Sequence, residues 1–170
     1  MGIRPLGETD LQAWFNFLNA HTSLTRQLDA ILGSRHGVSL AEHTVLQQLV
    51  LGGGHLRMTE LADTVLLSPS GTSRLVDRLV AGGLIERRSC DDDGRAVHAA
   101  ITDSGRARLE EAGPVYAEAL RRLFIDQFSA EEYEVLAALL LRVAPACRSR
   151  QAGVEPPVPS PLEPGRRAPR

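Results

Sequence analysis

The hydrophobic pattern between residues 59 and 79 predicts two short helices joined by a turn. In the second helix the inward positions recur at intervals of three and four residues, as on a helix packed against a core. These positions are Thr72, Leu75, Val76 and Leu79. In the first helix the inward positions are Leu61, Ala62 and Val65, and Thr59 occupies the expected N-cap position. The pattern therefore predicts a packed helix pair.

The second helix has a clear start signal and a polar outer face. Ser68 stands at the N-cap position and Pro69 at the first helical position, where these residue types favour helix initiation. The opposite stripe holds small polar and charged side chains: Ser70, Ser73, Arg74, Asp77 and Arg78. Such a pair is typical of a DNA-binding helix-turn-helix. Taken alone, the stretch fits simple packing of two amphipathic helices equally well.

A predicted hairpin after the helix pair favours DNA binding over simple packing. Residues 84–88 and 96–101 have the pattern of two strands, with Val97, Ala99 and Ile101 expected on one face. The loop between them is polar and contains an Asp-Gly turn signal. A helix-turn-helix followed by a hairpin with a charged tip is a winged helix, whose wing can reach an adjacent minor groove.

A long helical pattern precedes this region at about residues 9–33. It opens on a capping box at Thr9 and is expected to end at Gly33 and Gly37. Its seam alternates spacings of three and four residues and comprises Leu11, Trp14, Leu18, His21, Thr25, Leu28 and Leu32. The seam is consistent with core packing inside one subunit and equally with packing against a second chain.

Three more helices are predicted from their caps. Capping boxes at Ser39 and Ser129 open two of them, and Thr102 caps the third, in which Gly113-Pro114 predicts a kink or break. The last helix carries more apolar surface than one packing face needs, which indicates a partner. His55–Met58 is expected to be extended. The fold class is mainly α with a small β-hairpin wing.

Composition and charge limit the classes of function. The chain has 170 residues, of which 43% are hydrophobic and 24% charged, as in one soluble globular domain. It has no apolar run of bilayer length and no secretory leader, so we expect no membrane partner. Two cysteines form no disulfide framework, which favours a cytoplasmic location. A net charge of −2 gives no global support for nucleic-acid binding, so a local basic face is required.

The sequence carries no recognisable catalytic constellation. It lacks a G-x-S-x-G motif, and the glycines at 52–54 lack the lysine of a phosphate-binding loop. The histidines have no metal-ligand spacing, so we expect neither a metal nor another cofactor. Cys90 is followed by three aspartates, which disfavour its thiolate, so oxidation is not expected to be the signal. We therefore expect a protein that is not an enzyme.

The order of elements and several local motifs resemble the MarR family of bacterial transcriptional regulators. The match is carried by residues 56–109, LRMTELADTVLLSPSGTSRLVDRLVAGGLIERRSCDDDGRAVHAAITDSGRARL. It includes the wing signature, here Asp93, Arg95 and Ile101-Thr102. A looser likeness runs from Leu11 to Val143. One departure is Gly94 at a wing position where the family often has a basic residue.

The resemblance implies a homodimeric, ligand-responsive repressor that binds a pseudo-palindromic operator in double-stranded DNA. Two reading helices would enter successive major grooves about 10 bp apart. The domain would span residues 9–147, with a DNA-binding lobe at about 55–101 and an α-helical dimerisation region at about 9–33 and 102–147. Residues 148–170, rich in Pro and Arg, are predicted to be a disordered tail. The alternative is a winged helix that binds only proteins.

The DNA-contact candidates lie on the second helix and the wing. Arg74 and Arg78 are suited to bidentate contacts with guanine, unless they are merely solvated or paired with Asp77. Arg95 is the wing-tip candidate for the minor groove, oriented by Asp93. Ser70 and Ser73 are further candidates for base or phosphate contacts. Ser68 and Ser70, near the helix N-terminus, could hold a phosphate through backbone amides, and Arg88 is a candidate for contact with the DNA backbone.

The effector-site candidates are Trp14, His21 and His43. In the family, small aromatic or anionic molecules bind between the dimerisation helices and the DNA-binding lobe, and these side chains could line such a pocket. Core or surface roles explain each of the three as well.

Overall fold

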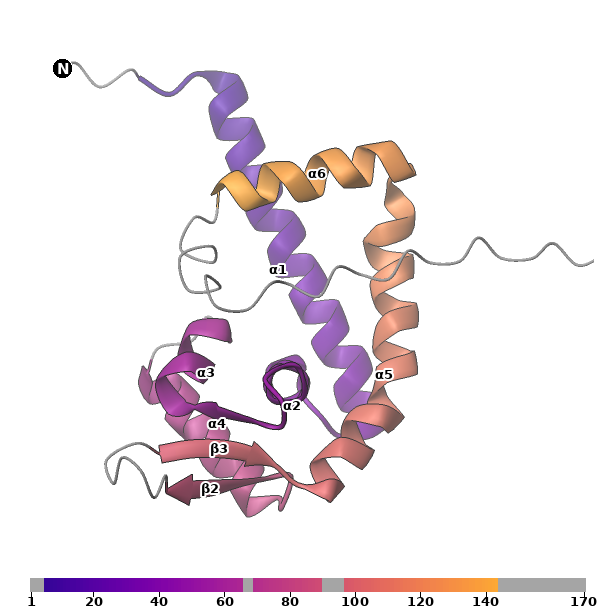
Figure 1. The fold of residues 1–170 in the computed structure, drawn as a ribbon. Coiled ribbons are helices and arrows are strands. Elements are labelled where there is room, and N and C mark those ends of the chain that lie inside the picture. Colours follow the sequence, from indigo (N-terminus) through magenta and orange to yellow (C-terminus); the bar gives the residue numbers. More distant parts are fainter. Residues whose placement is uncertain (1–4, 66–68, 90–96, 144–170) are drawn as a thin grey trace, which may run out of the picture. The chain divides into compact units, whose positions relative to one another are not determined.

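A computed structural model of the chain describes residues 5–65, 69–89 and 97–143 (Figure 1). The chain divides into two compact units, residues 1–127 and 128–170, which are described separately. The elements of the first unit, in order, are α1 (Glu8–His36), α2 (Leu40–Leu51), β1 (His55–Arg57), α3 (Met58–Thr64), α4 (Pro69–Ala81), β2 (Ile85–Ser89), β3 (Val97–Ile101), α5 (Asp103–Leu123) and the 3₁₀ helix η1 (Ile125–Gln127). The second unit contains α6 (Ala130–Val143).

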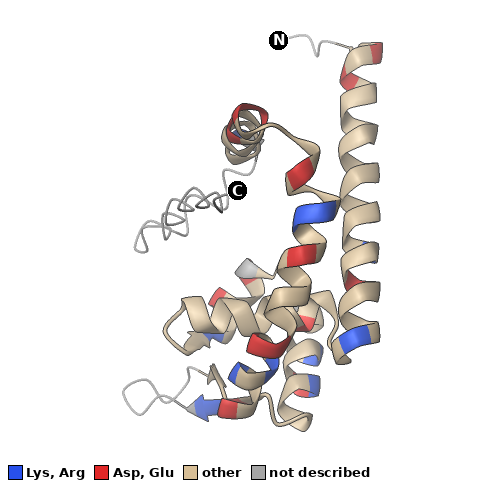
Figure 2. Cartoon of the chain, turned by 90° about the vertical axis from the view of Figure 1, so that its right-hand side faces the viewer, with Lys and Arg blue, Asp and Glu red and all other residues tan. Residues whose placement is uncertain are grey.

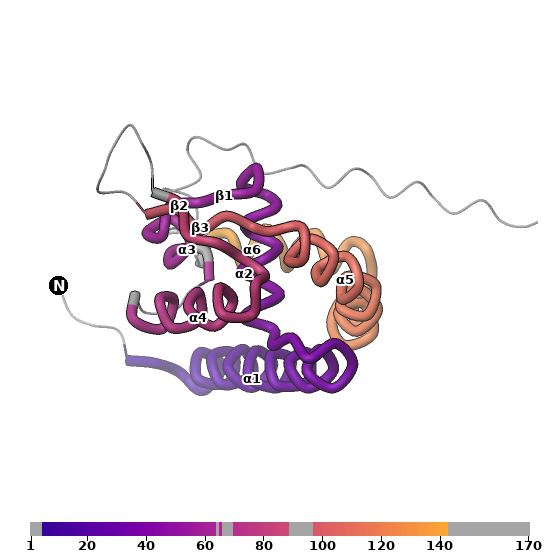
Figure 3. The backbone as a smooth tube through the Cα atoms, turned by 90° about the horizontal axis from the view of Figure 1, so that it is seen from below, coloured from indigo at the N-terminus to yellow at the C-terminus, as the bar shows by residue number. Residues whose placement is uncertain are grey.

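The three strands form one antiparallel sheet in the order β1-β3-β2. In its register Ile85 pairs with Ile101, and Arg57 pairs with His98. The predicted hairpin is therefore confirmed, and the short extended segment before α3 adds a third strand on the other side of β3. Figure 3 shows α4 on one side of the three strands.

The core of the first unit is built from the predicted stripe of α4. Thr72, Leu75, Val76 and Leu79 are at most 2% exposed. Leu61 of α3 is buried against them, and Val65 is partly buried there, as the pattern predicted. The remaining buried members come from α2 and the sheet: Val45, Leu46, Leu49, Ile85, Ala99 and Ile101. The helix pair is thus held by a continuous apolar cluster.

The prediction for the inner face of β3 was wrong at one end. Ala99 and Ile101 are buried, but Val97 is 45% exposed. Val97 is the first residue of the strand and pairs with Ser89 at the wing end, beyond the core cluster. Ala100, on the opposite face from Ala99, is also buried.

Three of the predicted helix caps are confirmed. The Ser39 hydroxyl accepts the Glu42 amide at 3.2 Å, and the Glu42 carboxylate accepts the Ser39 amide at 2.9 Å. Ser129 and Glu132 make the same reciprocal pair at the start of α6. The Thr102 hydroxyl accepts the Gly105 amide at 3.0 Å. These bonds satisfy amides that have no partner inside the helix.

The caps assigned to Thr9 and Thr59 were wrong. The N-cap of α1 is Gly7, whose amide donates to Asp10 at 2.9 Å. The N-cap of α3 is Arg57, whose amide donates to Glu60 at 2.9 Å. In both cases an acidic side chain three residues into the helix supplies the cap, and the residue at the N-cap position contributes no side-chain acceptor.

The expected helix end at Gly33 and the expected break at Pro114 are absent. Gly33 lies inside α1, which continues to His36 and ends at Gly37 in a left-handed conformation (φ 63°). Pro114 lies inside α5, which runs without a break from Asp103 to Leu123. Long helices flanking the lobe are therefore confirmed, with α1 longer than predicted.

The start of α5 is docked closely on the turn before β2. The Thr102 amide donates to the Leu84 carbonyl at 3.1 Å, and its hydroxyl donates to the Gly83 carbonyl at 2.7 Å. Gly105, in the first turn of α5, is buried directly against the Leu84 carbonyl oxygen, and a Cβ atom there would overlap that oxygen. This contact joins the flanking helix to the lobe.

The described helices include none that is both long enough and apolar enough to cross a bilayer. In the C-terminal half of α1, Leu28 and Leu32 are buried. The large apolar residues of its N-terminal half are exposed: Leu11, Trp14, Phe15, Phe17 and Leu18. In the second unit, Val135, Leu139 and Leu141 of α6 are also exposed.

Candidate nucleic-acid interface

The face of α4 opposite the core is polar and open to solvent. Ser70, Arg74, Asp77 and Arg78 are exposed, and Ser73 is partly exposed. The first turn of α4 contains no acidic residue, so the positive end of the helix dipole is not offset by a carboxylate of its own. The exposed polar side chains of α4 could therefore contact a DNA duplex, and its N-terminus could bind a phosphate group.

The two arginines of this face have different surroundings. Arg74 makes no ion pair with any residue that the structure describes. Arg78 forms an ion pair with Glu42 of α2, in which Nε lies 3.5 Å from Oε1. Neither arginine is paired with Asp77, so the pairing considered from the sequence does not form.

Asp77 instead links α4 to the sheet. Its carboxylate lies 2.8 Å from a terminal nitrogen of Arg87 on β2. Arg88, the next residue, donates from Nε to Glu86 at 2.7 Å and remains exposed. Arg87 and Arg88 are thus neighbouring basic residues of β2, and basic segments of the ribbon are blue in Figure 2. Arg88 therefore lies beside the wing with its charge partly offset by its own strand.

Three of the predicted contact residues, Ser68, Asp93 and Arg95, lie outside the described residues, as does Cys90. Their roles in capping, wing-tip contact and orientation stay predictions.

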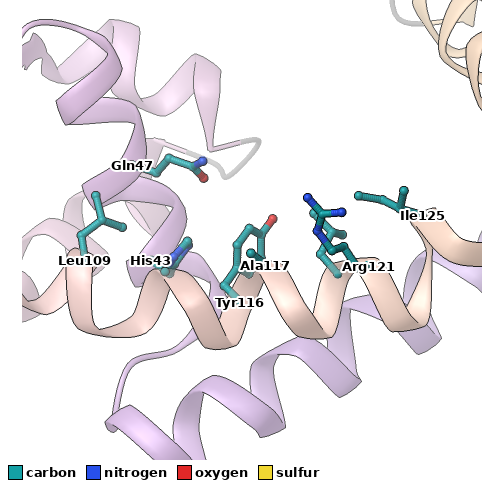
Figure 4. A pocket seen from close by; sticks show the side chains of 9 residues that line it. His43, Gln47, Leu109, Tyr116, Ala117, Arg121 and Ile125 are labelled. Atoms are coloured by element: carbon teal, nitrogen blue, oxygen red, sulfur yellow. The ribbon is translucent and has the colours of Figure 1, made fainter. Parts of the chain in front are cut away.

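A pocket of about 390 Å³ lies between α2 and α5 (Figure 4). Polar groups from both helices and apolar side chains share its wall: His43, Gln47, Leu109, Gly113, Tyr116, Ala117, Leu120, Arg121 and Ile125. Its size is that of sites for small ligands. A pocket that offers the cation of Arg121 together with the aromatic ring of Tyr116 and the aliphatic side chain of Leu120 has the groups needed to bind an aromatic anion.

His43 has the most unusual environment in this pocket. It is 2% exposed, and neither ring nitrogen has a hydrogen-bond partner among the described residues. Its ring centroid lies 4.4 Å from that of Tyr116. Burial lowers the pKa of His43 and raises the pKa of Tyr116, so a neutral imidazole faces a protonated phenol near neutral pH. Buried nitrogens without partners are a feature that a bound ligand can satisfy.

The other two effector candidates are not in this pocket. Trp14 and His21 lie on the exposed N-terminal half of α1, where Phe17 stands between them. The Phe17 ring centroid is 6.1 Å from that of Trp14 and 6.5 Å from that of His21. The structure thus brings one of the three candidates to the pocket and places the other two in an exposed aromatic row.

Comparison with known proteins agrees with this geometry. A family model described as MarR family matches residues 36–96, which cover α2 to the wing. A helix-turn-helix-type transcriptional regulator of Bacillus cereus is 30% identical over 122 residues, which are 72% of this chain and 80% of that protein. The chain belongs to the MarR family of transcriptional regulators. DNA binding through a winged helix-turn-helix is the function of this family.

Solved structures show the same MarR fold. Sco3205 of Streptomyces coelicolor, a MarR-family regulator solved in complex with DNA, is 29% identical with a TM-score of 0.80. That likeness covers 84% of this chain and 90% of Sco3205. AbsC from the same organism is 28% identical with a TM-score of 0.79, over 86% of this chain and 99% of AbsC.

Sequence reasoning missed several residues of this MarR-family chain. Tyr116 was not named as a candidate, although a buried tyrosine needs a partner for its hydroxyl and so marks a polar cavity. Arg121 and Gln47 gave no signal, because exposed arginines and glutamines are common on helices. Glu42 was recognised as a cap but not as a partner of Arg78.

The buried imidazole predicts a pH effect on stability. As the pH falls below the ordinary value of 6.5, the unfolded chain takes up a proton at residue 43 before the folded chain does, because burial lowers the folded pKa. Stability should therefore decline with falling pH, and it should decline less in His43→Phe. Urea unfolding at about pH 7.5 and about pH 5, at one protein concentration, measures both. Equal declines in the two proteins would contradict a neutral, buried His43.

Proposed function

We propose that this MarR-family chain is a homodimeric repressor that reads a pseudo-palindromic operator with α4 and releases it when a small aromatic anion enters the α2–α5 pocket. The observation that carries the proposal is the division of α4 into a buried stripe and an exposed polar face bearing Arg74. Arginine on such a face makes bidentate contacts with guanine in the major groove.

The proposal of a dimer is supported by the exposed apolar half of α1. Trp14, Phe15 and Phe17 are close neighbours on one helix and are all exposed, whereas the exposed apolar residues of a typical monomer are scattered singly. The sequence allowed two roles for the apolar seam of α1. Packing in the core explains the burial of Leu28 and Leu32, and packing against a second chain would cover the residues that are exposed in the N-terminal half of the helix. The assignment of residues 9–33 and 102–147 to dimerisation is part of this proposal.

The alternative, a winged helix that binds only proteins, has less support. The outer stripe of α4 offers no exposed aromatic side chain within its described residues, and protein interfaces depend on such anchors. No feature of the described lobe favours that function over DNA binding.

The test is binding to the DNA upstream of the protein's own gene, with a scrambled duplex as control. We expect a specific complex of two chains per operator. Its affinity should fall by about 10³-fold or more between about 50 and 200 mM salt, since arginine–phosphate contacts release counterions. A protein that retards no duplex at low salt, or that binds both duplexes alike, does not have this function.

The effector proposal is tested on the same complex. Benzoate and hydroxybenzoates should release the operator, with the carboxylate paired to Arg121 and the ring against Tyr116 and Leu120. Benzyl alcohol, which has the ring but no charge, is the matched control compound. Release by both compounds alike, or by neither, would exclude an anion site at Arg121.

A further inference from the structure

Glu42 makes two contacts with its two carboxylate oxygens. Oε2 accepts the Ser39 amide at 2.9 Å and closes the first turn of α2, while Oε1 lies 3.5 Å from Nε of Arg78 on α4. The Glu42 side chain is 20% exposed, against 61% for that of Arg78. The largely buried carboxylate of Glu42 on α2 thus lies next to the exposed guanidinium of Arg78 on α4.

The position of this anion is fixed by its own helix. The Ser39 hydroxyl accepts the Glu42 amide at 3.2 Å, which completes the capping box. The next amide, that of Leu40, donates to Asp29 of α1 at 2.8 Å, so the start of α2 is also tied to α1. Glu42 therefore has little freedom to follow Arg78, and it offers Arg78 an anionic partner at a fixed position.

The ion pair uses the nitrogen that DNA recognition does not need. A guanidinium has five N–H donors, of which one is on Nε and four are on the two terminal nitrogens. The two terminal nitrogens can by themselves make the two parallel bonds to guanine or to a phosphate. Within the described part of the chain, Arg78 pairs with Glu42 through Nε, which leaves both terminal nitrogens available. A carboxylate that blocked the arginine would instead take two of its donors side by side.

We propose that Glu42 is a positioning residue of the DNA interface, which holds Arg78 by Nε so that its terminal nitrogens face the operator. The inference rests on the proposed function of α4. Its physical basis is preorganisation: an arginine that is already oriented loses less side-chain freedom on binding than one that is free.

The experiment compares operator affinity in wild type, Glu42→Gln, Arg78→Ala and the double variant. Glutamine at position 42 still serves a capping box, so α2 keeps its first turn while the charge behind Arg78 is removed. We expect Glu42→Gln to weaken operator binding by about 10-fold at constant thermal stability, which is the size of a typical coupling between contacting residues. In the Arg78→Ala background the same change should have no effect.

The matched control is Glu60→Gln. Glu60 is exposed, lies in the same lobe and caps α3 through the Arg57 amide at 2.9 Å, and no described basic residue forms an ion pair with it. Its neutralisation should leave operator affinity unchanged or slightly higher, because a negative charge near DNA is lost. This control separates loss of a charge from loss of the Arg78 contact.

Each result decides the inference. A Glu42→Gln protein that binds as tightly as wild type, or more tightly, overturns it, and tighter binding identifies Glu42 as a competitor of the phosphate. A loss that persists in the Arg78→Ala background also overturns it, since Glu42 would then act through the fold. If wild type forms no operator complex, the proposed function fails. If wild type binds and Glu42→Gln changes nothing, this inference fails alone.

Discussion

Replacing Gly105 with alanine is expected to destabilise the protein by about 3 kcal/mol or more, a large share of the stability of a domain of this size. The added methyl group would overlap the Leu84 carbonyl oxygen, and its carbon would lie 2.8 Å from Cγ1 of Ile101. The Leu84 oxygen cannot move away freely, because it accepts the Thr102 amide at 3.1 Å. Relief of the overlap therefore requires α5 to separate from the turn before β2.

Urea unfolding followed by circular dichroism, at equal protein concentrations, measures this effect. Gly33→Ala is the matched control, because Gly33 lies inside α1 and nothing lies within 4 Å of the position of its Cβ. There the same substitution should stabilise the helix by about 1 kcal/mol. A Gly105→Ala protein with the midpoint of wild type would show that the close contact between α5 and Leu84 is wrong.

The second large effect is expected at Arg74. Arg74→Ala should weaken operator binding by about 100-fold or more, because a bidentate arginine contact is worth about 1–3 kcal/mol and a dimer would make two of them. The side chain is exposed and unpaired within the described residues, so stability should not change. Arg74→Lys should recover part of the salt-dependent affinity but not the preference for the operator, since an ammonium group lacks the planar fork.

The measurement is fluorescence anisotropy of a labelled operator and of a scrambled duplex at one salt concentration. Arg122→Ala is the charge-matched control. Arg122 is exposed in the last turn of α5, at the opposite end of that helix from the sheet (Figure 1). Wild-type affinity in Arg74→Ala would falsify the assignment of the outer face of α4 to base recognition.

Hydrophobic spacing was sufficient to predict the parts of the fold that are decided by burial. The four positions of α4 that recur at intervals of three and four residues are buried. The polar stripe on the opposite face of the helix is open to solvent. A hairpin after the helix pair was predicted from alternation and an Asp-Gly signal. These features are local, and one face of each element is fixed by the core.

Features that depend on contacts between distant residues were not predictable in this way. Thr9 and Thr59 were taken as caps because hydroxyl residues favour N-caps, but Asp10 and Glu60 cap from inside their helices. The pocket requires α2 and α5 to be adjacent, and no local pattern states which helices are neighbours. The pair between Glu42 and Arg78 joins residues 36 positions apart in the same way.

The order of the strands has a mechanical consequence for the reading helix. β1 ends where α3 begins, and β2 follows α4 after a short turn, while both strands are hydrogen-bonded to β3. The segment that contains α3 and α4 is therefore a closed loop with both ends attached to the same strand. Such a loop has no free end from which it can fray, and its two helices share one apolar cluster with the sheet, so we expect the helices and the sheet to unfold together. We therefore expect the outer face of α4, which is the proposed DNA-binding surface, to be lost and regained together with the sheet.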